Sequence, residues 1–134
     1  MVEPAPSQHT TVNLSFQPLA VHVRTARLVA VTVARRAGWG EEQVESVRQA
    51  VGEACALALR AAAERDAVTL ELDDAARGDD GEGLLAWVSP VSPATASADD
   101  VDDALPRAVL AGLTDDVVVE SRHGRPTLRL AWWR

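Results

Sequence analysis

The sequence predicts a single α/β domain built as a two-layer sandwich, with a mixed sheet of about five strands and three helices on one face. Its 134 residues suit one domain, and its hydrophobic share of 47% is typical of a globular protein. Apolar residues recur with the period of a strand in some segments and of a helix in others, in the order β-α-α-β-β-α-β-β. This order favours helices packed against a sheet. We expect residues 1–9 to be a flexible tail and residues 10–134 to form the domain.

The first strand and the first helix are predicted before residue 40. Apolar and polar residues alternate from Thr10 to Phe16, which is the period of a strand. From about residue 20 to residue 37, apolar residues recur at spacings of three and four, so one face of a helix is buried. This stripe consists of Val23, Ala26, Ala30, Val33 and Ala37. Gly38 is suited to cap the end of this helix.

A second helix is predicted from about Glu41 to Glu64. Two glutamates in its first turn favour the helix dipole, and the alanine-rich run that follows has high helix propensity. Its buried stripe consists of Val44, Val47, Val51, Ala54 and Ala58. Cys55 lies beside that stripe and is expected to be a small buried residue.

Two central strands are predicted next. Residues 68–73 alternate between apolar and polar, and the polar run over residues 73–83 predicts a turn. Residues 84–88 are apolar at every position, so we expect this strand to be covered on both faces.

The C-terminal part is predicted to contain one helix and two strands. A loop with proline and serine over residues 89–100 precedes a short helix over residues 102–111. Strands over residues 117–120 and 127–133 are joined by a hairpin turn at Gly124. Since side chains alternate across a strand, one residue of the pair Trp132 and Trp133 is expected in the core.

Charge and composition exclude several functions. The net charge of −7 disfavours binding to nucleic acid. All 13 basic residues are arginine, and without lysine a P-loop or a Schiff base is excluded. Residues 1–40 nevertheless carry a charge of about +3, which predicts a basic face at one end. The single cysteine and the lack of a signal peptide or a long apolar run favour a cytoplasmic protein with no membrane association.

No metal site is expected. The three histidines lie in different segments without other ligands at metal-binding spacing. Five aspartate pairs could bind a divalent cation, but none has the spacing of an EF-hand, so solvated loops and a helix cap are the preferred interpretation. Glu53 is a carboxylate within an otherwise apolar helix, so it could be a general base or a surface residue that pairs with Arg60.

Several runs of the sequence resemble the bacterial anti-sigma regulatory factors, which belong to the histidine-kinase-like ATPase superfamily and include serine-protein kinases. The runs are VRTARLVAVTVARRAG, VESVRQAVGEACALAL, LAGLTDDVVVE and RPTLRLAW. The resemblance covers most of residues 10–133 and is centred on residues 52–54. It implies the α/β sandwich of that superfamily.

The resemblance also implies a nucleotide site with three motifs, and all three depart from the family pattern. Glu53 matches the family glutamate, but Leu57 stands where an asparagine ligates magnesium. The aspartate-glycine motif that contacts adenine is absent after residues 84–88. The glycine-rich phosphate-binding stretch is also absent.

Glycine usage supports the same interpretation. No glycine occurs from Leu84 through Ala111, although a backbone that wraps phosphates closely usually needs glycine. Pro106 also removes one amide donor. We therefore expect no cofactor and a protein that kept the fold as a protein-binding module.

The expected partner is a sigma factor or an anti-anti-sigma protein, bound through the first helix. The predicted contact residues recur opposite the core stripe and are Arg24, Arg27, Leu28, Val31 and Arg35. Two alternatives remain open. One is an active ATP-dependent serine-protein kinase, in which Glu53 would be catalytic and Glu53 and Leu57 would line the nucleotide site; the other is a structural subunit that forms a homodimer.

Overall fold

The structure is a computed structural model that describes residues 11–78, 81–92 and 101–134. Within these residues the predicted element order is confirmed. The strands are β1 (Thr11–Phe16), β2 (Val68–Gly78), β3 (Gly81–Ser89), β4 (Asp116–Arg122) and β5 (Arg125–Trp133). The helices are α1 (Val21–Arg36), α2 (Glu41–Ala61) and α3 (Val101–Leu113). The predicted tail over residues 1–9 lies outside the described residues.

The sheet has the strand order β1-β2-β3-β5-β4, and every neighbouring pair is antiparallel. The prediction of a mixed sheet is therefore wrong. Helix α3 connects β3 to β4, and these two strands run in the same direction. They are not neighbours, however, because β5 lies between them and is antiparallel to both. The connection through α3 thus creates no parallel pair.

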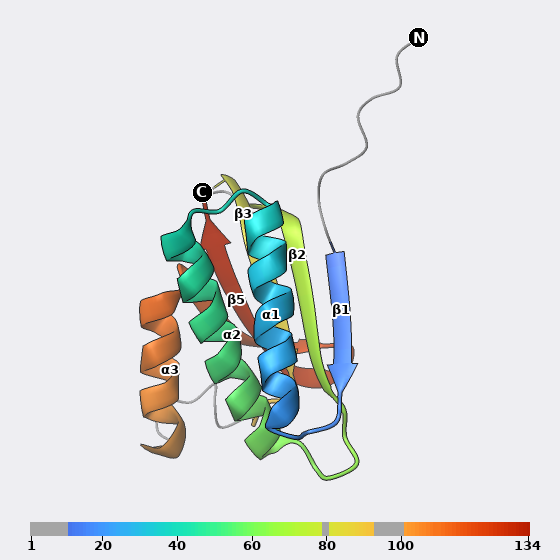
Figure 1. Cartoon of the computed structure of the whole chain (residues 1–134). Helices are drawn as coiled ribbons and strands as arrows, with labels where there is room; N and C mark the ends of the chain where they lie inside the picture. Colours follow the sequence, from blue (N-terminus) through green and yellow to red (C-terminus); the bar gives the residue numbers. More distant parts are fainter. Residues whose placement is uncertain (1–10, 79–80, 93–100) are drawn as a thin grey trace.

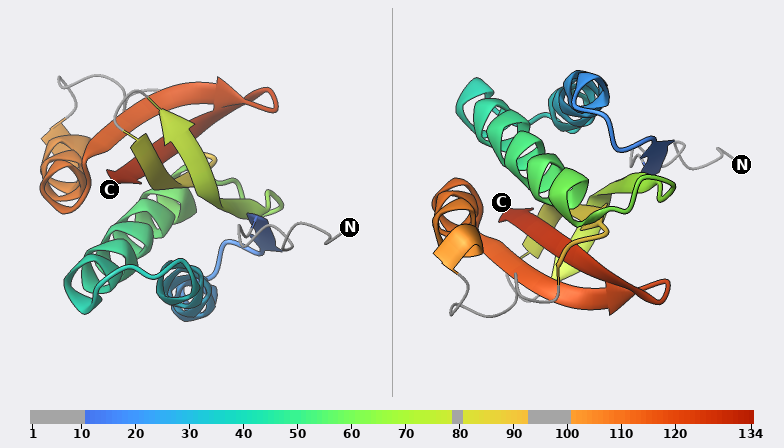
Figure 2. Two further views of the ribbon diagram at one scale, coloured as in Figure 1. Left: turned by 90° about the horizontal axis from the view of Figure 1, so that it is seen from above. Right: turned by 90° about the horizontal axis from the view of Figure 1, so that it is seen from below.

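All three helices lie on one side of the sheet, as Figures 1 and 2 show. Helix α1 packs over β2, α2 over β2 and β3, and α3 against α2 and β4. The predicted stripes of both long helices are buried, except that Ala37 is the half-exposed cap residue of α1. The largest fully buried side chains of the sheet are Leu70, Leu72, Leu84, Leu128 and Leu130. The core is therefore the single layer between helices and sheet.

The two central strands differ from their predicted form in two ways. The polar run over residues 73–83 does not form only a turn, because β2 continues to Gly78 and β3 already begins at Gly81. Pairing across these strands satisfies backbone groups even where the side chains are polar. Furthermore, β3 is covered by helices on one face only. Leu84 is fully buried on that face, whereas Leu85 and Trp87 are half-buried on the other.

The β4–β5 hairpin forms as predicted around Gly124. Arg122 pairs with Arg125, so the loop consists of His123 and Gly124, with φ angles of 53° and 75°. Two positive φ angles are required by the two-residue turn that suits the twist of a hairpin. Of the two terminal tryptophans, Trp132 is buried, and its Nε1 donates to the carbonyl oxygen of Leu113 over 2.8 Å.

Candidate functional site

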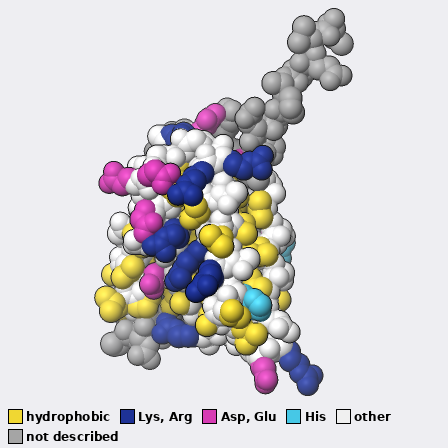
Figure 3. All heavy atoms as spheres, in the orientation of Figure 1, with side chains coloured by type: hydrophobic (Ala, Val, Ile, Leu, Met, Phe, Trp, Pro, Cys, Tyr) yellow, Lys and Arg dark blue, Asp and Glu magenta, His cyan; other side chains and the backbone are white. Residues whose placement is uncertain are grey.

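The exposed side of α1 combines apolar and basic side chains. Val21 and Leu28 are 71% and 61% exposed, and Arg24 is exposed between them. Helix α1 contains no acidic residue. Figure 3 shows arginine and hydrophobic side chains mixed over this face of the molecule. Apolar groups surrounded by arginine are common at protein–protein interfaces.

Val31 does not belong to this exposed face, so its prediction as a contact residue is wrong. Its side chain is 9% exposed and is part of the hydrophobic core. The reason is that α1 packs beside α2 as well as onto the sheet. The buried surface of α1 is therefore wider than the single stripe that spacing predicts.

Arg27 lies across α2 rather than pointing away from it. A Cβ atom added to Gly52 would be only 2.8 Å from Arg27 Nη2 and even closer to Nε. The absence of a side chain at Gly52 thus makes room for the guanidinium. Arg27 is also close enough to Cys55 for its charge to affect the pKa of that thiol. The position of Arg27 is therefore determined by α2.

Arg35 is held by an ion pair at the opposite end of α1. Its Nε and Nη2 atoms each donate to a carboxylate oxygen of Glu41 over 3.1 Å. These hydrogen bonds lower the pKa of Glu41, and both side chains remain exposed. Of the five predicted contact residues, only Arg24 and Leu28 are thus exposed without an ion pair or close packing among the described residues.

The other predicted site residues lie on α2 and do not converge. Glu53 is exposed, whereas Leu57, one turn further on, is 4% exposed and belongs to the core. His22 and His123 lie on α1 and on the β4–β5 turn. No three metal-binding side chains come together in the described part of the chain. The aspartates at positions 79, 80, 99 and 100 lie outside it.

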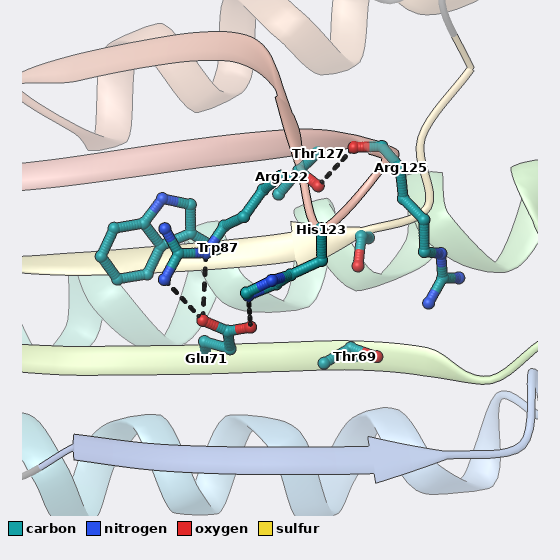
Figure 4. A pocket seen from close by; sticks show the side chains of 8 residues that line it. Thr69, Glu71, Trp87, Arg122, His123, Arg125 and Thr127 are labelled. Atoms are coloured by element: carbon teal, nitrogen blue, oxygen red, sulfur yellow. Dashed lines mark hydrogen bonds and ion pairs between the residues drawn. The ribbon is translucent and has the colours of Figure 1, made fainter.

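A cluster on the helix-free face of the sheet was not predicted. Arg122 Nη2 donates to Glu71 Oε2 over 2.8 Å, and His123 Nε2 lies 3.3 Å from the other oxygen of this carboxylate. The guanidinium carbon of Arg122 also lies 4.0 Å from the centre of the Trp87 ring. Figure 4 shows these side chains around a pocket of about 80 Å³.

The sequence contains no signal for this cluster. Glu71 is on β2 and Arg122 is on β4, and two further strands separate them in the sheet. They meet because the end of the β4–β5 hairpin, beyond the last pairing of β5 with β3, reaches over the helix-free face. Because Arg122 already satisfies Glu71, the cluster is well suited to hold the hairpin in place.

The chain thus combines an antiparallel sheet that is covered by helices on one face with a first helix, α1, whose exposed side is apolar and basic. A family model described as histidine kinase-like ATPase domain matches residues 16–132. The chain therefore belongs to the histidine kinase-like ATPase family. A search of curated proteins found no match. Within the described residues, no helix has the length and apolar character needed to cross a membrane.

The buried thiol of Cys55 should make the stability of the folded protein depend on pH. Burial raises the pKa of Cys55 from 9.0 to about 12, although the positive charge of Arg27 opposes the shift. The folded state holds the thiol proton more tightly than the unfolded state does. The stability that this difference contributes is full below pH 9 and is lost as the pH rises towards 12. We expect an added decline of about 1.4 kcal/mol per pH unit in the free energy of unfolding over this window.

Denaturant unfolding of the protein and of Cys55→Ala between pH 8 and 11 measures this decline. Alanine cannot ionise, so the difference in slope between the two proteins isolates the thiol. Equal slopes above pH 9 would mean that the thiol of Cys55 is solvated in the folded protein.

Proposed function

We propose that this protein is a regulatory protein-binding module of the anti-sigma kind, which controls transcription by binding a sigma factor or an anti-anti-sigma protein without using ATP. The observation that carries the proposal is the exposed side of α1, where Leu28 and Arg24 lie together. On a chain with a net charge of −7, the exposed Arg24 and Arg36 of a helix without an acidic residue form a local basic surface. Such a surface favours an acidic partner.

The proposed loss of ATP binding is supported by three features of the chain. Leu57 is buried where the resemblance places a magnesium-binding asparagine. Pro106 lies inside α3, where it removes a backbone donor. No glycine occurs between Leu84 and Ala111, so close wrapping of phosphates would require other residues to adopt costly conformations. Fold membership alone does not imply nucleotide chemistry, because function depends on the site.

The protein is therefore expected not to bind ATP with magnesium at useful affinity. Titration calorimetry of the full chain with ATP and MgCl₂ should show no saturable heat. A dissociation constant of about 100 μM or tighter, worth roughly 5.5 kcal/mol, would contradict this expectation. It would favour the alternative of an active serine-protein kinase with Glu53 in the nucleotide site.

The protein-binding function is tested by affinity capture from the native host with the full chain as bait. We expect a sigma factor or an anti-anti-sigma protein among the retained proteins, in a complex that can be rebuilt from purified components. A stable homodimer that rebuilds with neither class of partner would favour a structural dimerisation subunit.

A further inference from the structure

Strand β1 is an edge of the sheet with unusual chemistry. It is the first strand in the sheet order, so one of its two edges has no neighbouring strand among the described residues. It pairs with β2 without interruption from Thr11 to Phe16. The sequence of β1, TVNLSF, contains no charge, proline or glycine. Proteins usually protect an edge strand with such residues or with a bulge, because a regular edge attracts another strand.

The other edge of the same sheet is protected in the usual way. Strand β4 carries Asp116, Glu120 and Arg122 along seven residues. Asp116 is paired with Arg129 on the neighbouring strand, with 3.1 Å between their charged atoms. Charged side chains along an edge disfavour the addition of a strand. The absence of charge is therefore specific to β1.

A groove accompanies the open edge of β1. A cavity of about 260 Å³ lies between Val12 on β1 and one flank of α1, where Leu28 and Thr32 line it. The apolar side chains of β1 are only half-buried, since α1 is the one helix close to them. A strand added beside β1 would point every second side chain to the helix side of the sheet. Those side chains would enter this groove.

We propose that β1 and this groove bind an extended segment of a protein partner, in which apolar residues alternate and acidic residues flank them. The inference rests on the proposed function, because it specifies how the partner is bound. Backbone hydrogen bonds to β1 would supply affinity, and the groove would select the alternate apolar side chains. Arg36 lines the groove and Arg24 is exposed on the same helix, so acidic flanks are attracted.

Charge argues against a second copy of this chain as the occupant. Pairing of two β1 strands would bring two α1 helices to the same sheet junction, each with the exposed Arg24 and Arg36 and no acidic residue. Like charges at an interface disfavour association. A partner with carboxylates instead complements this helix.

The test uses a random library of 12-residue peptides displayed on phage and selected on the purified full chain. We expect enrichment of peptides in which apolar residues alternate and aspartate or glutamate flanks them. Binding of the best synthetic peptide should fall at least tenfold in Thr25→Trp, which fills the groove from an exposed helix position. Thr25→Glu should have the same effect through repulsion, whereas Gln43→Trp, an exposed position on α2 away from the groove, should not.

Hydrogen exchange locates the bound peptide. Alternate backbone amides of β1 should exchange more slowly when the peptide is bound. The inference fails if no such peptide is enriched, or if both Thr25 variants bind as the unchanged protein does. The inference also fails if these amides are already protected in a homodimer, because a second copy of the chain then covers the edge. It fails likewise if deletion of residues 1–10 speeds their exchange, because that segment then covers the edge.

The outcomes separate this inference from the proposed function. Peptide binding at β1 without capture of a transcription regulator would leave the docking edge intact and refute the function. Capture of a regulator whose affinity is unchanged by both Thr25 variants would support the function and refute the docking edge.

Discussion

Reversing the charge of Arg24 and Arg27 together should abolish capture of the protein partner, with a loss of affinity on the order of 1,000-fold. Arginines at the centre of an interface often contribute 2 kcal/mol or more each, and glutamates would repel an acidic partner instead of attracting it. Binding of the captured partner to Arg24→Glu/Arg27→Glu, measured by calorimetry or interferometry, tests the expectation. The Arg24 substitution should change the thermal midpoint little, because that side chain is exposed.

The contact between Arg27 and Gly52 calls for a second variant. Because Arg27 packs over α2, its replacement removes a contact between the two helices as well as a surface charge. Arg24→Glu/Leu28→Gln changes only side chains without close packing and should cause a similar loss. Arg65→Glu, at an exposed position beyond the end of α2, changes the net charge by the same two units and should bind normally. If the partner binds both α1 variants as tightly as the control, the binding surface lies elsewhere.

Replacing Leu57 with asparagine should destabilise the fold by about 2–5 kcal/mol. The variant loses a buried aliphatic side chain and places an amide among apolar atoms, where it lacks hydrogen-bond partners. A loss of this size corresponds to a fall of roughly 7–18 °C in the thermal midpoint for a domain of this length. Thermal and denaturant unfolding of Leu57→Asn measure both quantities.

Two controls separate burial from helix propensity and from nucleotide binding. Ala56→Asn introduces the same residue at the neighbouring exposed position of α2 and should cost less than about 1 kcal/mol. Addition of ATP and magnesium should not raise the thermal midpoint of Leu57→Asn, because the other two motifs remain absent. Stabilisation by ATP in this variant alone would show that the pocket is intact and that one substitution separates it from function.

Local pattern was sufficient to predict the elements and the core. The alternation in β1 and the spacing of apolar residues in α1 and α2 produced elements close to those observed, and Cys55 is buried as expected. These predictions succeed because side-chain direction repeats every two residues in a strand and every 3.6 in a helix. A buried face must then be apolar, so the period identifies the stripe that faces the sheet.

The neighbours of each element were not predictable in the same way. The spacing of Val31 places it opposite the stripe, yet α2 covers it, and the spacing of Arg27 cannot show that Gly52 makes room for its guanidinium. The direction of strand pairing was also missed, because the insertion of β5 between β3 and β4 depends on the course of the whole chain. These features arise from contacts between residues far apart in the sequence.

By itself, then, the sequence determined the helices, the strands, the apolar core and the family resemblance that the match to residues 16–132 supports at the level of the superfamily. Only the tertiary structure decided which arginines of α1 are available to a partner, that β1 is an open edge beside a groove, and that Arg122 meets Glu71. The physical reason is that periodicity records whether a side chain faces the core, whereas exposure at a surface depends on which other elements pack beside it.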